Sequence, residues 1–386
     1  MNYCKSIIFL ICMFSPLTAV WAQQKYSSRV IDDKTGEALP YASIYIAEGN
    51  GTLTNHDGEF TVLANQDDTL RISYVGYEKM FVKASDLKSP VRLKPFTMEM
   101  EELQVKVDQR RDILKKLINQ LAEDFDKAKK ADGIYFFRTY MVSRKRYPEM
   151  TEGFMIARGA VNLRDPYLIS GENRSADPNK ERYVYATNVF LLYSLGPQIH
   201  GRGFWQFATT PLKSYFMMNQ KFRLSTQSFV NEEGHRIYVF HLKYKNKVPK
   251  GVNHNPVMDG TVYVDSATNH MLRFDGNLLH VTQRVSGNRE TASMTIHAEY
   301  SYEHGYAEVS HISVEGGNQD MLTRSIVFRV EDYNGKRKLG TMNNLMNDVD
   351  KAGFDPELWK RYDIIQRAKA EEQLAKIAKN DSILEQ

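Results

Sequence analysis

The chain has 386 residues, of which 42% are hydrophobic and 25% are charged, and its formal net charge is +4. A net charge this small for the length neither requires nor excludes an anionic partner, and we predict no nucleic-acid partner. The chain contains 22 Tyr and 19 Phe, which favours β structure. Its two cysteines, Cys4 and Cys12, lie near the start, so the rest of the chain can form neither disulfides nor thiol-based sites.

Residues 1–22 are typical of a secretory signal peptide. Lys5 precedes an apolar run over residues 6–14, and small residues lead to a predicted cleavage after Ala22. An isoleucine precedes Cys12 where a lipoprotein signal requires a small residue, so we expect no lipid anchor. No later apolar segment approaches the roughly 18 residues of a membrane-spanning helix, so we expect none after cleavage. The sequence therefore predicts an exported protein.

Residues 23–107 alternate short β-forming runs with turns. Residues 41–46 alternate tyrosine or serine with small or aliphatic side chains, the period of a strand with one buried face. Gly36 permits positive φ at a turn, and Asn50-Gly51 and Asp57-Gly58 are strong turn signals. Turns recur about every 8–12 residues, which predicts a β-sandwich of six or seven strands.

A recognisable pattern runs through this stretch. It comprises Val30, Asp32, Thr35-Gly36, Leu39-Pro40, Ala42, Ile44, Ile46, Gly51, Thr54, Gly58, Phe60, Leu70, Ser73 and Gly76-Tyr77. The pattern resembles the carboxypeptidase-regulatory-like domain, although Ser28 stands where that family often has glycine. The resemblance implies a seven-stranded prealbumin-like sandwich that accompanies other domains and carries no peptidase chemistry. His56 and Glu59 have the spacing of a zinc ligand pair but straddle a turn, and we interpret them as a solvated hairpin.

The segment after the sandwich carries a second resemblance. Val91-Arg92-Leu93-Lys94-Pro95 and residues 100–107 resemble the passage that joins this module to the plug of TonB-dependent transporters. Roughly 280 residues remain, too few for a plug and a 22-stranded barrel. The resemblance implies a shared Gram-negative envelope, in the periplasm or at the outer membrane, and not a shared activity.

Residues 108–132 predict one connecting helix. Ile113, Leu114, Leu117, Leu121 and Phe125 recur at intervals of three and four and form a single apolar stripe. We interpret the segment as a helix that packs against the rest of the protein.

Residues 133–340 predict a large antiparallel β-domain. Apolar and polar side chains alternate in several segments, and short connections rich in Gly, Asn or Asp separate them. The ten candidate strands are 134–142, 152–161, 181–192, 221–230, 235–244, 260–265, 270–282, 291–302, 307–314 and 323–330. About ten strands exceed what a flat sheet tolerates, so we expect a curved, half-barrel-like sheet.

Residues 259–273 predict a hairpin, with an Asp-Ser-Ala-Thr-Asn turn between two strands. This hairpin resembles that of the LolA/LolB-like half-barrels, in which a curved sheet holds an apolar ligand. A closed or irregular β-domain is the alternative.

Residues 195–219 interrupt the β-domain with an irregular segment. Aromatic side chains on a loop suit the mouth of a ligand site or a protein contact. The candidate binding residues are Phe204, Trp205, Phe207, Tyr215 and Phe216. The alternative is ordinary core that caps the open end of the half-barrel.

Residues 341–386 predict a helical tail. Its helical pattern begins at Pro356 and continues to about Lys379, with a partial apolar stripe among many charges. This tail is either a docking helix or a partly frayed terminus.

The usual catalytic motifs are missing from the sequence. It contains no His-Glu-x-x-His helix, no Gly-x-Ser-x-Gly elbow and no phosphate-binding glycine loop. His297, His304 and His311 are spaced by seven and, if they converged with Glu299 or Glu308, could bind a transition metal. We favour solvated strand histidines, and predict no catalytic residue, no metal and no cofactor.

These observations predict a non-catalytic binding or accessory protein of the envelope. The sandwich would dock, and the curved sheet would bury an apolar ligand or a partner surface. The expected partner is an outer-membrane protein or a lipid. The alternatives are a structural subunit of an outer-membrane transporter system and an envelope hydrolase with an unrecognised site.

Overall fold

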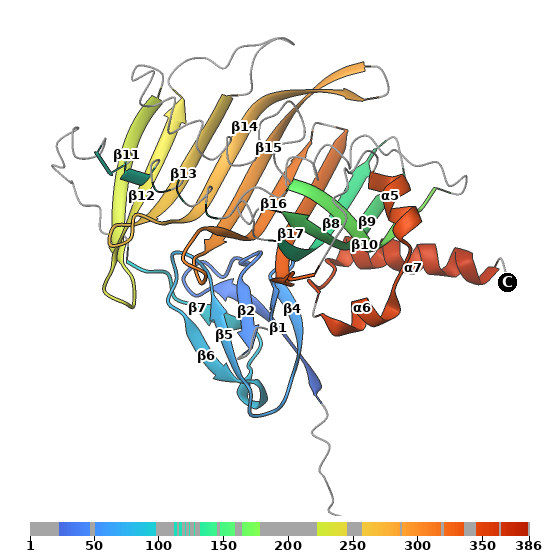
Figure 1. Ribbon diagram of the computed structural model, residues 1–386, viewed down its shortest axis with the longest axis horizontal. Coiled ribbons are helices and arrows are strands. Elements are labelled where there is room, and N and C mark those ends of the chain that lie inside the picture. The colour runs from blue at the N-terminus through green and yellow to red at the C-terminus, as the bar shows by residue number, and fades with distance from the viewer. Residues whose placement is uncertain are drawn as a thin grey trace, which may run out of the picture.

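The structure, a computed structural model, comprises a small β-sandwich, a ten-stranded curved sheet and short C-terminal helices (Figure 1). The predicted fold class, mainly β with a large antiparallel curved sheet, is confirmed. Apart from single positions between 112 and 127, the described residues are 23–46, 51–97, 132–144, 147–158, 164–177, 222–244, 257–285, 288–317, 320–335, 345–362 and 364–384.

Seven short strands form the N-terminal sandwich. They are β1 (Gln24–Asp32), β2 (Ser43–Ile46), β3 (Gly51–Leu53), β4 (Glu59–Ala64), β5 (Thr69–Ser73), β6 (Met80–Lys83) and β7 (Val91–Leu93). One sheet has the order β4-β1-β7 and the other β3-β2-β5-β6. The strands' alternating apolar side chains, such as Val30, Ile44, Phe60 and Ile72, meet between the two sheets in a fully buried core.

The turn before β2 differs from the sequence-based expectation. The alternation over residues 41–46 suggests a strand that includes Tyr41, but Tyr41 has φ of 63° and the strand begins at Ser43. Buried Thr54 holds this turn, because its Oγ1 donates to the carbonyl of Leu39 (2.6 Å) and accepts from the amide of Ala42 (2.8 Å). A tyrosine in the left-handed region is uncommon and is often found at functional sites, so the contacts of its ring are of interest.

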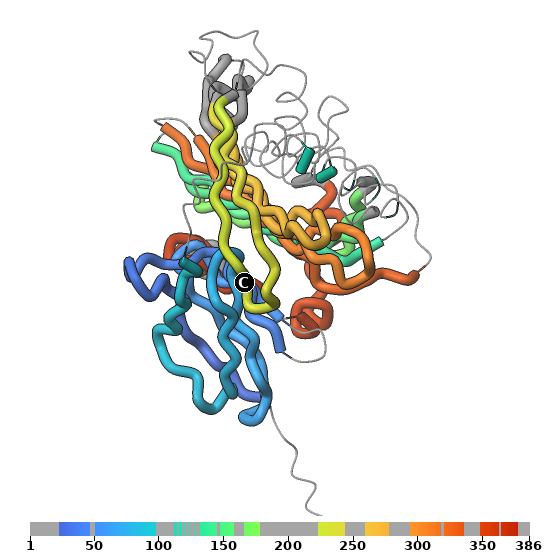
Figure 2. The backbone as a smooth tube through the Cα atoms, turned by 90° about the vertical axis from the view of Figure 1, so that its left-hand side faces the viewer, coloured from blue at the N-terminus to red at the C-terminus, as the bar shows by residue number. Residues whose placement is uncertain are grey.

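The large sheet is antiparallel throughout, with the order β10-β9-β8-β17-β16-β15-β14-β13-β12-β11. Its strands are β8 (Asp132–Ser143), β9 (Glu149–Arg158), β10 (Arg164–Ser175), β11 (Phe222–Val230), β12 (Arg236–Tyr244), β13 (Val257–Asp265), β14 (Met271–Val285), β15 (Asn288–Ser301), β16 (Glu308–Gly317) and β17 (Met321–Asp332). The chain therefore runs as two meanders joined where β17 pairs with β8. Figure 2 shows the curvature of the sheet above the sandwich.

Nine of these strands overlap the predicted ones, and β10 does not. Its sequence includes Pro166 and Gly171 among several polar residues, which is a poor strand signal. The strand is tolerated because β10 lies at an edge of the sheet and pairs only with β9 among the described residues. The predicted strand over 181–192 lies outside the described residues.

The two faces of the sheet bury different clusters. Phe136 and Phe328 point to the side of the sandwich, where they pack with Leu53 of β3 and Ile365. The alternate residues Tyr135, Phe137 and Val327 pack on the opposite face, with Val349 of α5 (Leu345–Ala352). This strict alternation is the period-two pattern of a sheet covered on both sides.

The C-terminal segment docks on the sheet. It contains α6 (Pro356–Arg361) and α7 (Lys369–Leu384), and the prediction of one helix from Pro356 is wrong because residues 362 and 364–368 interrupt it. Leu374 and Ala375 of α7 are buried against Tyr140 and Met150. Among the described residues this tail is therefore a docking element.

Two further predictions concern helices. The described positions of the predicted connecting helix, Asp112, Ile113, Lys116, Leu117, Gln120, Glu123 and Lys127, are helical, and Leu117 is fully buried. Within the described ranges, no helix combines the length and the apolar character needed to cross a membrane.

Candidate functional site

The sandwich is fixed to the large sheet by polar and aromatic contacts. Lys79 donates from its backbone amide to Glu232 (2.5 Å) and from Nζ to Glu233 (2.6 Å). Phe96 stacks on Phe229 with ring centroids 5.1 Å apart. These contacts join two segments of the N-terminal part, at Lys79 and Phe96, to the end of β11 and the turn that follows it, so the sandwich has a defined orientation on the sheet (Figures 1 and 2).

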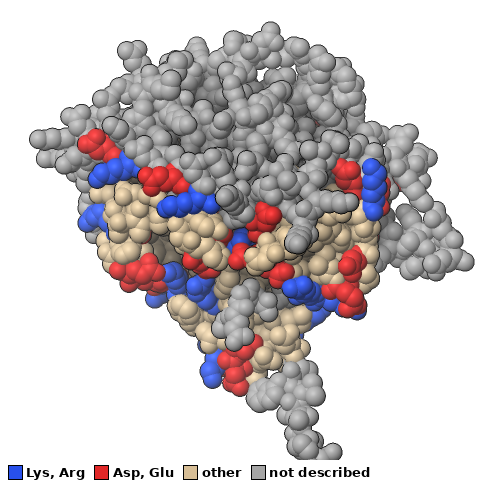
Figure 3. All heavy atoms as spheres, viewed as in Figure 1, with Lys and Arg blue, Asp and Glu red and all other residues tan. Residues whose placement is uncertain are grey.

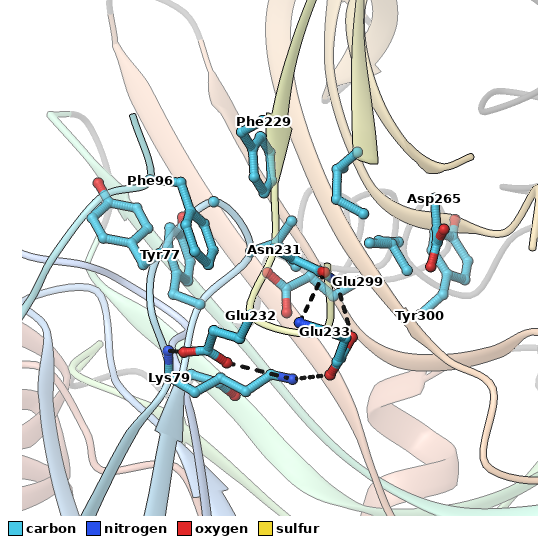
Figure 4. Close-up of a pocket in the computed structure, with 16 residues that line it drawn as sticks. Tyr77, Lys79, Phe96, Phe229, Asn231, Glu232, Glu233, Asp265, Glu299 and Tyr300 are labelled. Carbon is cyan, nitrogen blue, oxygen red and sulfur yellow. Dashed lines mark hydrogen bonds and ion pairs between the residues drawn. The ribbon is translucent and has the colours of Figure 1, made fainter. Parts of the chain in front are cut away.

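A cavity of about 240 Å³ lies in this junction. Tyr74, Tyr77, Phe96, Phe229 and Leu272 contribute aromatic and aliphatic surface to its lining. Carboxylates complete the lining, from Glu232, Glu233, Asp265 and Glu299, together with the ammonium of Lys79. In Figure 4 the Lys79, Glu232 and Glu233 side chains lie together, with Phe96 and Phe229 above them. The cavity thus combines apolar walls with an excess of negative charge.

The floor of the junction is a row of charged side chains on three neighbouring strands. Arg273 and Asp275 of β14 lie opposite Glu299 and His297 of β15, and Glu299 lies opposite His311 of β16. Residues two apart on a strand share a face, so all five side chains point to the side of the sandwich. They form a charged stripe on the face of the sheet that the sandwich covers.

Short contacts connect most of this row. His297 Nδ1 lies 2.6 Å from Asp275 Oδ1, and Arg273 Nε donates to Asp275 Oδ2 at 2.9 Å. Arg273 also donates to the carbonyl of Val75 in the sandwich (3.1 Å), and its guanidinium lies 4.6 Å from the ring centre of Tyr74. Arg273 therefore links the sheet to the sandwich through a hydrogen bond and a cation–π contact.

His311 is the exception in the row. It is fully buried, yet neither ring nitrogen has a hydrogen-bond partner among the described residues. His297 Nε2 and Glu299 Oε1 are also buried without such a partner and lie 3.7 Å apart. Each buried polar atom left unpaired costs about 1–3 kcal/mol. The ligand atoms of His297, Glu299 and His311 all lie within 4.8 Å of one another, and the three residues could hold a metal ion.

The surroundings set the charge of these groups. Burial lowers the pKa of His311 to about 3, so its imidazole is neutral at neutral pH. Burial and Arg273 both oppose a charge on His297, but Asp275 and Glu299 outweigh them and leave its pKa raised. Burial also opposes the charge on Glu299, yet the adjacent histidines leave its pKa lowered, so Glu299 is a carboxylate.

Two tyrosines of the sandwich cover this row. Tyr74 stacks on His297, and Tyr41, the residue with positive φ, lies over both His297 and His311 with centroids 6.5 and 6.1 Å away. The Thr54 hydrogen bonds that impose the unusual turn therefore also position a ring over the two histidines.

A second group of possible metal ligands consists of His304 and Asp332, which are exposed at the protein surface, and of Glu308, which is buried beside them. His304 Nδ1 is 2.9 Å from Glu308, and Arg329 pairs with both carboxylates. The hydrogen bond to Glu308 raises the pKa of His304. These charges already neutralise one another, as in an ordinary surface ion-pair network.

The structure tests only part of the sequence-based site predictions. Phe204, Trp205, Phe207, Tyr215 and Phe216 lie outside the described residues. Of the three histidines spaced by seven, His297 and His311 converge with Glu299, whereas His304 lies in the separate surface group. His56 lies 3.6 Å from Glu315 of β16 and forms no metal-ligand group with Glu59.

Charges on the visible face of the described part are mixed. In Figure 3 lysine and arginine side chains alternate with aspartate and glutamate along the sandwich and the adjoining sheet. On this face the described residues form no extended patch of one sign, in keeping with the small net charge.

Comparisons with known proteins identify the sandwich. Residues 26–108 match the family model of the CarboxypepD_reg-like domain, which confirms the resemblance predicted for this region. No curated protein matches the chain.

Three solved structures each align with more than half of this chain, but with low TM-scores. A domain from Vibrio parahaemolyticus, assigned to outer membrane lipoprotein sorting, is 12% identical and covers 62% of this chain and 97% of its own, with a TM-score of 0.24. A LolA superfamily protein from Nitrosomonas europaea is 9% identical and covers 57% of this chain and 97% of its own, with a TM-score of 0.23. A DUF1329 family protein from Desulfovibrio piger is 11% identical and covers 60% of this chain and 95% of its own, with a TM-score of 0.23. Scores this low assign no function to the sheet.

Proposed function

We propose that the protein is a non-catalytic binding protein of the cell envelope, whose ligand occupies the junction cavity between sandwich and sheet. The observation that carries the proposal is the lining of that cavity, in which aromatic surface and carboxylates meet. Ligand sites combine apolar walls with a few placed polar groups, and they occur preferentially between domains. In this proposal the sandwich is one wall of the binding site as well as an accessory module.

The lining favours a small amphiphile that carries a cationic group. The cavity has four carboxylates against one ammonium, and its walls include Tyr74, Tyr77, Phe96 and Phe229. Aromatic faces and carboxylates both attract organic cations. The volume of about 240 Å³ is close to the lower limit of typical ligand pockets, which are roughly 300–1,000 Å³, so the bound group is small.

Lys79 offers a direct test, because its ammonium occupies the carboxylates that a ligand cation would use. In Lys79→Ala, Glu232 and Glu233 lose their positive partner. We expect butyltrimethylammonium to bind this variant several-fold more tightly than the wild type in calorimetric titration, and butyrate to bind neither. Lys83→Ala is the matched control, since Lys83 lies at the other end of β6 and pairs with Asp67 outside the cavity. Equal binding of the two probes, or an equal gain in the Lys83 variant, would refute the proposal.

A further inference from the structure

The row of charged side chains beneath the sandwich contains polar atoms that the protein itself does not satisfy. His311 is 0% exposed and both of its ring nitrogens lack a hydrogen-bond partner among the described residues. His297 Nε2 and Glu299 Oε1 also lack a hydrogen bond among the described residues, lie at ion-pair distance from each other (3.7 Å), and converge with His311. Buried polar groups are nearly always paired, so several unpaired atoms that converge indicate a missing component.

We propose that His297, Glu299 and His311 bind one divalent transition metal ion of the zinc class. Two imidazoles and one carboxylate are a ligand set that such ions prefer. In a tetrahedral zinc site with bonds of about 2.0–2.1 Å, neighbouring ligand atoms lie roughly 3.3–3.5 Å apart. The His297 Nε2 to Glu299 Oε1 distance is 3.7 Å, and all three ligand atoms lie within 4.8 Å, so small side-chain rotations complete the site.

The ring nitrogen of His297 that faces away from the proposed ion has the partner typical of a metal-binding histidine. His297 Nδ1 lies 2.6 Å from Asp275, which leaves Nε2 directed at the proposed ion. A carboxylate on the far nitrogen of a histidine ligand fixes the ring and strengthens it as a donor. Asp275 is itself held by Arg273 at 2.9 Å, so the orientation of the ligand is determined from β14.

The local charge also accommodates a divalent cation. Asp275 and Glu299 contribute two negative charges and Arg273 one positive charge, which leaves one negative charge once His297 has released its proton, as metal binding requires. A bound divalent ion reverses this to a single positive charge, spread over its ligands. The surface group of His304, Glu308 and Asp332 differs, because Arg329 already pairs with both of its carboxylates.

Three ligands leave a tetrahedral ion with one open position. Glu299 lines the junction cavity as well as the proposed site, so the fourth ligand can enter from that side. The metal site shares Glu299 with the cavity lining, but its other two ligands, His297 and His311, do not line the cavity.

The test is metal binding by the full chain. The purified protein is freed of metal with a chelator, verified by elemental analysis, and titrated with Zn²⁺ against a chromophoric competitor. We expect one equivalent to bind and to raise Tm, and Co²⁺ to give the visible absorption of a nitrogen- and oxygen-ligated ion. Failure of the wild type to bind either ion would overturn the proposal, and would leave the cavity ligand untouched.

Variants locate the ion. His311→Leu removes only unpaired polar atoms, so it should fold, and we expect it to lose Zn²⁺ affinity by at least 100-fold, as should Glu299→Gln. Asp275→Asn should weaken binding 10- to 100-fold through the orientation of His297. His304→Gln is the matched control and should bind as the wild type does. Retained binding in His311→Leu, or loss in His304→Gln, would assign the ion elsewhere and refute the site.

Discussion

Tyr74 of the sandwich lies nearly parallel to His297 of the large sheet, with ring centroids 6.1 Å apart and an angle of 13° between the planes. Tyr74 follows β5, so this stack joins the sandwich to the middle of the ten-stranded sheet. The same ring lines the junction cavity. One aromatic side chain therefore borders both the cavity and the buried row of charges, and both depend on the position of the sandwich on the sheet.

Replacement of this ring tests the role of the sandwich as a cover. Tyr74→Ala removes the stack on His297 and the contact with Arg273, and we expect it to lower the free energy of unfolding by about 2–4 kcal/mol, below the full cost for a completely buried ring. Tyr74→Phe keeps the ring and should cost less than about 1 kcal/mol. Urea unfolding measures both. Equal losses in the two variants would show that the stack contributes nothing.

Arg273 is expected to be irreplaceable by lysine. Its planar guanidinium binds Asp275 and the carbonyl of Val75 while it lies over two tyrosine rings, and an ammonium cannot make all of these contacts. We expect Arg273→Lys to cost about 2–3 kcal/mol in chemical unfolding, since Asp275 would be left buried and poorly paired. Arg71→Lys is the control, because Arg71 only stacks on Tyr45. A loss as small as that in the control would contradict this account.

The architecture was largely predictable because both halves follow local rules. Alternating side chains and glycine turns define short strands, and nine of the ten large-sheet strands overlap the segments that periodicity predicts. The exception, β10, carries Pro166 and Gly171, and only its edge position makes that composition acceptable. The turn at Tyr41 could not be predicted from local sequence either, because Thr54, twelve or more residues away, imposes its left-handed conformation.

The site was predictable only in part. Charged residues two apart on consecutive strands, as in Arg273 and Asp275 or His297 and Glu299, are a visible signal of a polar stripe on one face. Neither the face of the sheet that the sandwich covers nor the bulge in the β15–β16 pairing between Glu299 and Tyr300 could be predicted from the sequence. The spacing of seven wrongly grouped His304 with His297 and His311, because that bulge and the turn at Gly305 offset the register.

A buried ion network should also control the attachment of the tail. Glu152 of β9 is fully buried between Arg138 (2.7 Å) and Arg367, and Arg138 also donates to the carbonyl of Ile365. Glu152→Gln removes the carboxylate that both guanidinium groups share and leaves Arg138 with Glu371 (3.3 Å) and Arg367 with Glu372 (3.7 Å). We therefore expect a loss of about 3 kcal/mol in chemical unfolding, the lower end for a broken buried ion pair. Glu357→Gln breaks only the exposed pair with Lys360 and should cost less than about 1 kcal/mol. Comparable losses would show that the network is energetically unimportant.

The same carboxylate predicts how stability depends on pH. Burial acts to raise the pKa of Glu152, but Arg138 and Arg367 outweigh it and hold the pKa below its ordinary value of 4.5. A group with a lowered folded-state pKa stabilises the protein fully above its unfolded-state pKa, and this contribution is lost as the pH falls through the folded-state value. The stability difference between wild type and Glu152→Gln should therefore be constant from pH 7 to about pH 5 and shrink below 4.5. Urea unfolding at a series of pH values measures that difference, in which carboxylates outside this ion network cancel. A difference that persists unchanged to pH 3, or that shrinks already above pH 6, would contradict the assignment of this charge.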